Sequence, residues 1–377
     1  MAQHALLGAS SAHRWLNCPP SARLTEHIAD KGSSYAAEGT LAHALAEDQL
    51  NYYKDKGTLN GWVVPEKFKV NPLYYESMVD DIAVYVNYVI ETFESKSDAA
   101  VLELESRLDY STWVPEGFGT GDAIIIDNDT LEVIDLKFGK GVVVDAEDNP
   151  QLKLYGLGAL EANSYIYDID KVSTTIVQPR LDHISTQTYS VWELQEWADK
   201  TVLPIAVLAY KGEGETKAGE WCKFCKLRAT CETRAKYLDS IASLRTKNTL
   251  SDEELSTVLT NASEIRAWLS DVEENALKMV LDGYELPGWK VVEGRSNRKI
   301  KDPEALAADL LNRYSEEAIY KPKELLTLTG LEKLVGKKKF AESYGDYIYK
   351  PEGKPTLVPE ADKRPPLHSA EADFDYE

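Results

Sequence analysis

The 377-residue sequence predicts an α/β fold, a mixed central sheet flanked by helices and followed by a mostly helical C-terminal extension. Three observations lead to this prediction. Apolar residues recur at helical spacing near the N-terminus, apolar and charged residues then alternate as in strands, and helical and strand-like segments follow in turn. That succession is typical of one sheet with helices on its faces.

The individual elements are predicted from the period of the apolar residues, in chain order. Helices are expected at 34–53, 71–95, 149–163 and 192–212. Strands are expected at 99–110, 121–128, 131–139, 171–180 and 183–191. The first three strands form a meander whose second connection is the turn-rich DNDT, and Asn149 and Pro150 are placed as a helix start.

Three regions are expected from the change in composition after Cys231. Residues 1–235 form the core domain, and 236–350 a helix-rich accessory region with helices at 250–282 and 303–343. Between these helices lies a short strand or hairpin that carries four basic residues, Arg295, Arg298, Lys299 and Lys301. The tail, 351–377, is rich in proline and acid and is expected to be disordered.

Composition narrows the class of protein. Hydrophobic residues make up 43% and charged residues 28%, and no stretch approaches the roughly 18 consecutive apolar residues of a membrane span. The first twenty residues lack the basic flank and apolar segment of a signal peptide, which predicts a cytoplasmic protein. A formal charge of -21 opposes a protein that coats DNA electrostatically, but it leaves room for an enzyme with one local basic channel.

Two charged residues interrupt the apolar run VIDLKF. On a β-strand Asp135 and Lys137 share one face while Ile134, Leu136 and Phe138 share the other. The D-x-K spacing therefore directs both charged groups toward one spot. A surface salt bridge at the end of a strand, with Lys137 solvated, explains the pattern equally well.

Asp122 adds a second carboxylate near this spot, because it begins the preceding predicted strand after GTG. If 122–126 and 132–137 pair through the DNDT turn, Asp122 and Asp135 come near each other. Two carboxylates that close repel unless a divalent cation or a shared proton compensates them. We therefore expect either a bound cation or a shared proton at this end of the meander, with Lys137 near enough to hold a water or a phosphate oxygen.

Two predicted helices bring further candidates. His43 lies four residues before Glu47 and five after Glu38, where it can reach a metal held by the sheet, although a helical histidine is more often a packing residue. Gln151 and Tyr155 are four apart and so face the same way, with Gln151 in a first turn whose free N–H groups favour phosphate. An ordinary amphipathic helix is the alternative.

The order G-x-x-x-H, G-x-x-D, D-x-K and Q-x-x-x-Y resembles the RecB-like branch of the PD-(D/E)-x-K nuclease superfamily. The resemblance spans about residues 10–235 and implies a restriction-endonuclease-like core that cuts DNA with a divalent metal. It implies that Mg²⁺ or Mn²⁺ is held by His43, Asp122, Asp135 and the main-chain carbonyl of Leu136, with Lys137 catalytic, Gln151 and Tyr155 at the substrate, and Gly39 in the first motif.

Two glutamates fit this resemblance less well. Glu105 matches a recurrent glutamate ahead of the acidic motif. Glu38 departs from it, because relatives often have a basic residue before the glycine, and it receives no role.

The four cysteines are Cys18, Cys222, Cys225 and Cys231, the last three in WCKFCKLRATC. They are too few for a disulfide scaffold, and their local spacing suits either zinc or an iron–sulfur cluster. One cysteine before the core and three after it is similar to the [4Fe–4S] staple of RecB-like nucleases such as AddB-type helicase–nuclease subunits and CRISPR-adaptation nucleases. The resemblance therefore implies a [4Fe–4S] cluster, with structural Zn²⁺ as the alternative.

The function expected from these features is a metal-dependent deoxyribonuclease, an exonuclease, with DNA as its partner. The segments SSAHRWLNCPPSARL and GWKVVEGRSNRK are similar to a phage and prophage family, which implies a role in phage recombination, repair or DNA processing in a bacterial host, beside an annealing protein or a helicase. The alternative is a DNA-binding or recombination scaffold that keeps a nuclease-like fold without turnover. The basic residues from Arg295 to Lys301 are candidates for a DNA track, or ordinary solvated charge.

Overall fold

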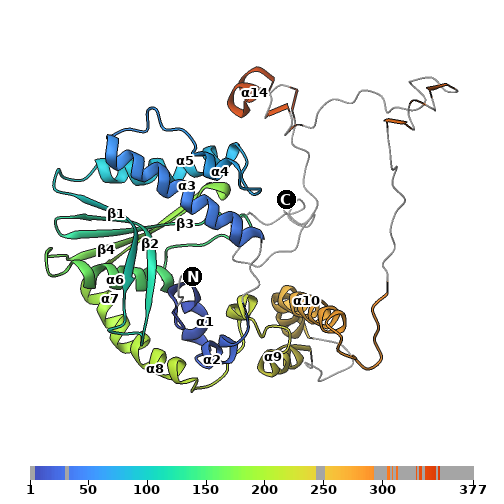
Figure 1. The fold of residues 1–377 in the computed structure, drawn as a ribbon. Helices are drawn as coiled ribbons and strands as arrows, with labels where there is room; N and C mark the ends of the chain where they lie inside the picture. Colours follow the sequence, from blue (N-terminus) through green and yellow to red (C-terminus); the bar gives the residue numbers. More distant parts are fainter. Residues whose placement is uncertain are drawn as a thin grey trace, which may run out of the picture. The chain divides into compact units, whose positions relative to one another are not determined.

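The computed structural model describes residues 5–29, 34–242 and 251–292, and short stretches between 304 and 348. The chain divides into two compact units, Met1–Lys278 and Met279–Glu377. The first unit contains a five-stranded sheet in the order β1-β2-β3-β4-β5 (Figure 1). The strands are β1 Val101–Asp109, β2 Phe118–Asp127, β3 Thr130–Leu136, β4 Lys171–Gln178 and β5 His183–Ser190.

The sheet is mixed, as the sequence predicts. Strands β1, β2 and β3 form the expected antiparallel meander, and Asn128 has a left-handed φ of 51° in the DNDT turn between β2 and β3. Strand β4 runs parallel to β3 after the crossover helix α6 (Pro150–Asn163), and β5 returns antiparallel to β4. The predicted α/β class, with helices beside one mixed sheet, is confirmed.

One face of the sheet is covered by α3 (Ser34–Lys56) and α5 (Ser77–Glu94), with the short α4 (Glu66–Lys69) beside them (Figure 1). Alternation along β2 explains the contact, because Ala123 and Ile125 point into this layer. The side chains by which α3 packs on this face recur at helical spacing. They are Leu41, Ala42, Leu45, Ala46, Gln49, Leu50 and Tyr53.

The other face packs against the crossover helix α6, and four further helices complete the same buried cluster (Figure 1). These are α1 (Ala12–Asn17), α2 (Ser21–Glu26), α7 (Val191–Trp197) and α8 (Leu203–Lys211). The predicted single helix at 192–212 is wrong in one respect, because a π-helical segment, Ala198–Val202, separates α7 from α8. Pro204 lies two residues after it, in the first turn of α8, and has no N–H to donate to the preceding turn.

Helices α9 (Glu232–Ala242) and α10 (Asp252–Leu281) follow the cysteine-rich segment, and α10 confirms the helix predicted at 250–282. In the second unit the structure describes α14 (Lys337–Tyr344) at the end of the predicted 303–343 segment. The four basic residues from Arg295 to Lys301 and the tail 351–377 lie outside the described residues. Among the described helices none is both long and apolar enough to cross a membrane.

Candidate functional site

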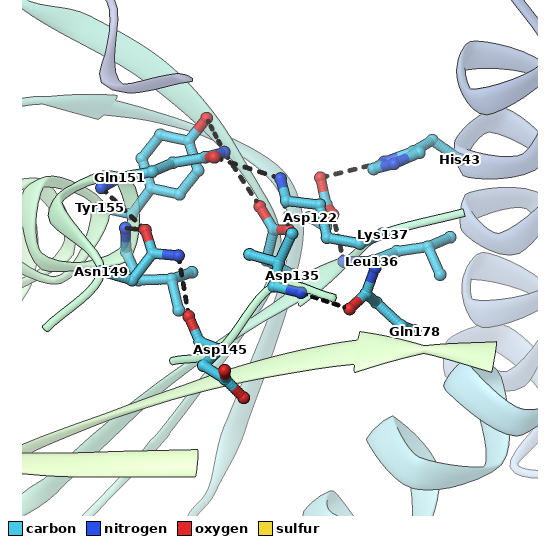
Figure 2. A network of polar contacts seen from close by, with 12 residues as sticks. His43, Asp122, Asp135, Leu136, Lys137, Asp145, Asn149, Gln151, Tyr155 and Gln178 are labelled. Atoms are coloured by element: carbon cyan, nitrogen blue, oxygen red, sulfur yellow. Dashed lines mark hydrogen bonds and ion pairs between the residues drawn. The ribbon is translucent and has the colours of Figure 1, made fainter. Parts of the chain in front are cut away.

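The site begins where β2 and β3 stop pairing. Their register runs from Asp127↔Thr130 to Ala123↔Ile134, and Asp122 is the next residue of β2. Beyond this point a side-chain oxygen of β2 takes the place of a backbone acceptor, because Leu136 N donates to Asp122 Oδ2 at 2.8 Å. The carboxylate is thereby fixed at the edge of the opening between the two strands (Figure 2).

His43 reaches the same carboxylate from α3. Its Nδ1 lies 3.2 Å from Asp122 Oδ1, as Figure 2 shows. Burial lowers the pKa of His43, but the hydrogen bond and the charge of Asp122 outweigh burial and raise it overall. The histidine predicted on the helix and the aspartate predicted on the sheet are therefore brought into contact.

Glu105 completes a set of three possible metal ligands. One ligand atom each from His43, Glu105 and Asp122 lie within 4.8 Å of one another. A small cavity beside them is also lined by Glu47 and Leu136. The two carboxylates suit Mg²⁺ or Mn²⁺, and the imidazole nitrogen is a ligand for transition metals. The donor chemistry of the three residues therefore fits a divalent cation, as the resemblance implies.

Two features of Glu105 are unusual for a residue within a strand. Its φ is 47°, in the left-handed region, although the β1–β2 register continues unchanged on either side, at Leu104↔Ala123 and Ser106↔Gly121. Burial and the charge of Asp122 raise the pKa of its carboxyl to about 7. A strained backbone and crowded negative charge are features of a functional site, and a bound cation would relieve the repulsion.

Asp135 and Lys137 form the second part of the site. Lys137 Nζ lies 2.8 Å from Asp135 Oδ2 and donates to Gln151 Oε1 at 3.2 Å. Gln151 Nε2 in turn donates to Asp135 Oδ1 at 3.2 Å and lies 3.3 Å from the hydroxyl of Tyr155 (Figure 2). Asp135 is 2% exposed, and burial together with the charge of Asp122 raises its pKa, while Lys137 opposes that shift.

This second part lies next to the triad, but neither Asp135 nor Lys137 belongs to the set of ligand atoms that lie within 4.8 Å of one another. Asp135, which the sequence assigns as a metal ligand, pairs with Lys137, and Glu105 takes the third place among the mutually close ligand atoms. Lys137 itself follows the last residue of β3, and its backbone N–H donates to Val177 O at 2.9 Å. The backbone of Lys137 is thus fixed on β4, while its ammonium group contacts Asp135 and Gln151.

The start of α6 fixes Gln151 and Tyr155. Asn149 caps the helix, with its Oδ1 accepting from Gln151 N at 3.0 Å and from Leu152 N at 3.4 Å. A Cβ at Gly119 would come within 2.6 Å of the Tyr155 ring. The first glycine of GTGD therefore leaves the space that the tyrosine ring occupies.

Gln178 holds the loop that follows Lys137. This residue ends β4 and is 1% exposed. Its Oε1 accepts from Val144 N at 2.7 Å, and its Nε2 donates to Val142 O at 2.9 Å. The loop is therefore fixed to the sheet beside the lysine (Figure 2).

A half-buried ion-pair network gives Glu38 the role that the sequence left open. Arg180, just after β4, lies 2.9 Å from Glu38 on α3 and 3.9 Å from Asp81 on α5. The Tyr75 hydroxyl donates to Glu38 at 3.2 Å, and the Arg180 guanidinium lies 4.8 Å from the ring centroid of Phe138, next to Lys137. Sequence reasoning missed Arg180, because the pairing spans 142 residues and QPR has no distinctive pattern.

The four cysteines that the sequence offers as metal ligands lie around one cavity. Cys18, Cys222, Cys225 and Cys231 line one cavity, and all four are free thiols. Burial raises the pKa of Cys222 and of Cys225, and neighbouring cysteines add to the shift in both cases. The first helical turns of the chain and the segment after α8 therefore meet at a cluster of sulfur atoms.

The four sulfur atoms line the same cavity without all lying close to one another. Within the described residues, the triad of His43, Glu105 and Asp122 is the one set of three or more ligands whose atoms all lie within 4.8 Å, and no three cysteines meet that limit. Around tetrahedral zinc, with Zn–S of about 2.3 Å, the sulfurs would be about 3.8 Å apart. The thiols would therefore have to turn toward one another to hold a single zinc ion.

Comparison with known proteins places the chain in a family. A solved structure described as "Crystal structure of SSO0001" is similar to 57% of this chain and 93% of its own, at 15% sequence identity and a TM-score of 0.25. Residues 4–365 match the family described as "Protein of unknown function (DUF2800)". Because that match covers nearly the whole chain, the protein belongs to the DUF2800 family.

Proposed function

We propose that the protein is a metal-dependent deoxyribonuclease, an exonuclease that hydrolyses DNA phosphodiester bonds in phage recombination, repair or processing. One observation carries the proposal: where β2 and β3 part, a His–Glu–Asp triad lies beside an Asp135–Lys137–Gln151 network. The first group offers ligands for Mg²⁺ or Mn²⁺, and the second offers a positioned ammonium. A metal ion that activates water and a cation that stabilises charge on the phosphate both lower the barrier to phosphodiester hydrolysis.

The residues of the triad would hold the ion, with Asp122 fixed by Leu136 N and His43 supplied by α3. When bound, a divalent cation supplies a water of lowered pKa and positive charge beside the scissile phosphate. Lys137, positioned by Asp135 and Gln151, orients the attacking water and donates to the phosphate oxygen that gains charge. Asp135 keeps the ammonium in place.

Gln151, Tyr155 and Gly39 would contact the strand being cut. Gln151 is in the first turn of α6, where backbone N–H groups favour a phosphate. Gly39 lies one helical turn before His43 on the same face of α3, and a Cβ built there meets nothing within 4 Å. Packing therefore does not require this glycine, and the open space is available to a DNA backbone.

The cysteine cavity fits a metal centre, and we propose a [4Fe–4S] cluster there. Four cysteines from the two ends of the core domain line the cavity. One cysteine before the core and three after it resemble the [4Fe–4S] staple of RecB-like nucleases, and structural Zn²⁺ is the alternative. Such a centre would tie Cys18 near α1 to the segment before α9, and its binding free energy would add to folding stability.

The experiment that tests the nuclease is the release of acid-soluble nucleotides from end-labelled single- and double-stranded DNA. Protein purified without oxygen is assayed with Mn²⁺ or Mg²⁺ beside Lys137→Ala and beside Lys140→Ala, an exposed neighbour in the same loop. We expect Lys137→Ala to lose about 10²–10⁴-fold in rate and Lys140→Ala to keep most of it. End-labelled products also distinguish cutting from ends from internal cutting.

Absence of cutting by wild-type protein that carries its metal centre, on every substrate tried, would overturn the nuclease. DNA binding without turnover would then favour the recombination scaffold. Cutting that survives in Lys137→Ala would instead move the chemistry away from the D-x-K strand.

A further inference from the structure

Two arginines connect the cysteine segment to helix α10. Arg228 Nε lies 2.7 Å from Asp271 Oδ1, and Arg234 Nη1 lies 2.8 Å from Asp271 Oδ2. Arg234 Nη1 also donates to the main-chain carbonyl of Arg228 at 3.0 Å, and its Nε lies 3.5 Å from Glu264. One carboxylate thus holds both guanidinium groups, each through a different oxygen.

The same arginines border the four sulfur atoms. Arg228 lies between Cys225 and Cys231 in sequence, and Arg234 three residues after Cys231, and both line the cysteine cavity with Arg14. Arg234 is 2% exposed, so its charge needs partners of opposite charge close by. Asp271 and Glu264 face it from α10, and the thiolates that a metal centre requires would face it from the cavity.

We propose that Asp271 is a positioning residue for the cysteine-bound metal centre: its carboxylate holds Arg228 and Arg234 beside the sulfur atoms, and the filled centre in return fixes α10. The inference rests on the proposed metal centre and assigns it an outer partner. Ligand orientation by such a partner is a general property of metal sites. Coupling between two sites is reciprocal. Loss of Asp271 should therefore speed the release of the metal, and loss of the metal should make α10 less stable.

The test compares three substitutions on α10 in the full chain. Asp271→Asn keeps the shape and removes the charge, whereas Asp271→Glu keeps the charge. Glu273→Gln removes an exposed charge two residues away. Metal content is measured by elemental analysis after anaerobic purification, and the rate of metal loss to a chelator is followed by visible absorbance, or by a zinc indicator if zinc is found.

We expect Asp271→Asn to lose metal about 10–100-fold faster than wild type, with Glu273→Gln unchanged and Asp271→Glu intermediate. Arg228→Gln offers a second route if Asp271→Asn folds poorly, because Arg228 has a side chain that is 42% exposed and tolerates change. Metal loss from Arg228→Gln and Asp271→Asn at the wild-type rate would overturn the inference.

Hydrogen exchange supplies a readout that does not depend on activity. Amides of α10 around 264–271 should exchange faster in metal-free wild type than in loaded protein, and Asp271→Asn should exchange fast in both states. Equal exchange with and without metal would overturn the coupling. If the wild-type protein contains no cysteine-bound metal, both the proposed centre and this inference are wrong. The nuclease proposal would still hold if that protein cuts DNA normally.

Discussion

Asp122 and Leu136 are joined by a hydrogen bond from the backbone N–H of Leu136 to Oδ2 of Asp122, at 2.8 Å, just beyond the last paired residues of β2 and β3. One carboxylate therefore has two tasks. Its Oδ2 accepts the hydrogen bond that follows the last backbone pair of β2 and β3, and its Oδ1 lies close to His43. A structural role and a ligand role at one residue can be separated by choosing the substitution.

Asp122→Asn should separate the two roles. The amide oxygen can still accept from Leu136 N. We therefore expect the free energy of unfolding, measured with a chemical denaturant, to stay within about 1 kcal/mol of wild type. Affinity for Mn²⁺, measured by calorimetry, should fall at least about tenfold, because a charged ligand is lost. Asp122→Ala leaves Leu136 N without its partner and should lose about 1–3 kcal/mol as well. Unchanged Mn²⁺ affinity in Asp122→Asn would contradict the ligand role.

The metal-free protein should lose stability as the pH rises. The folded pKa of Glu105, about 7, exceeds its ordinary value of 4.5, so its protonated form favours folding below pH 4.5 and this contribution is lost as the pH rises toward 7. His43 also has a raised pKa, and its contribution likewise disappears as the pH rises through that pKa. Both groups act in the same direction.

Urea unfolding in a chelator at pH 5.5 and pH 8 measures this effect. Glu105→Gln should reduce the difference between the two pH values, and Glu91→Gln, on the exposed side of α5, should not. Added Mn²⁺ should stabilise wild type more at pH 8 than at pH 5.5, because the ligands bind metal without their protons. A wild-type protein whose stability in chelator rises between these values, with Glu105→Gln following it, would show that the carboxyl is not held protonated.

Much of the sheet and half of the site could be predicted from the sequence. Alternation gives the faces of a strand directly, so the proximity of Asp135 and Lys137 follows from their spacing. The DNDT turn sets the β2–β3 register, which places Asp122 beside the end of β3. Asn149 and Pro150 likewise start α6 where the turn chemistry predicts.

The rest depends on contacts that no local pattern encodes. Helices α1 and α2 have six residues each, too few for a periodic signal. The sequence marks Glu105 only by its resemblance to a recurrent glutamate, because its left-handed φ and its place beside His43 and Asp122 become visible only in the folded strand. The Arg180–Glu38 pair joins segments far apart in the chain, and hydrophobic periodicity carries no information about such a pairing.

Arg180 and Glu38 should be energetically coupled. Arg180→Met keeps much of the side chain's length and leaves two half-buried carboxylates without their cation, so we expect a loss of about 1–3 kcal/mol in the free energy of unfolding. Glu38→Gln in the same chain should restore part of it, giving an interaction energy of about 0.5–3 kcal/mol in a double-mutant cycle. Additive losses would show that the pair does not tie α3 to the sheet edge near Lys137.

Gly39→Ala should make the protein more stable and less able to bind DNA. Replacing a glycine within a helix by alanine stabilises it by about 0.5–1 kcal/mol, and the new Cβ meets nothing within 4 Å. If a DNA strand approaches the backbone of α3 one turn before His43, the added methyl group occupies that approach. We therefore expect weaker binding of a single-stranded oligonucleotide to the Lys137→Ala background, by fluorescence anisotropy, and a slower cut in the otherwise wild-type chain.

Thr40→Ala is the matched control for this substitution. It lies next to Gly39 on an exposed position of the same helix, and it also replaces a poorer helix former by alanine. Both variants should gain stability, so a shared change in cutting would be a consequence of a stiffer helix. A loss confined to Gly39→Ala would place the strand against α3, because only that methyl group points along the face that carries His43. Binding and cutting at wild-type levels in Gly39→Ala would move the DNA path away from this helix, toward the start of α6 at Gln151.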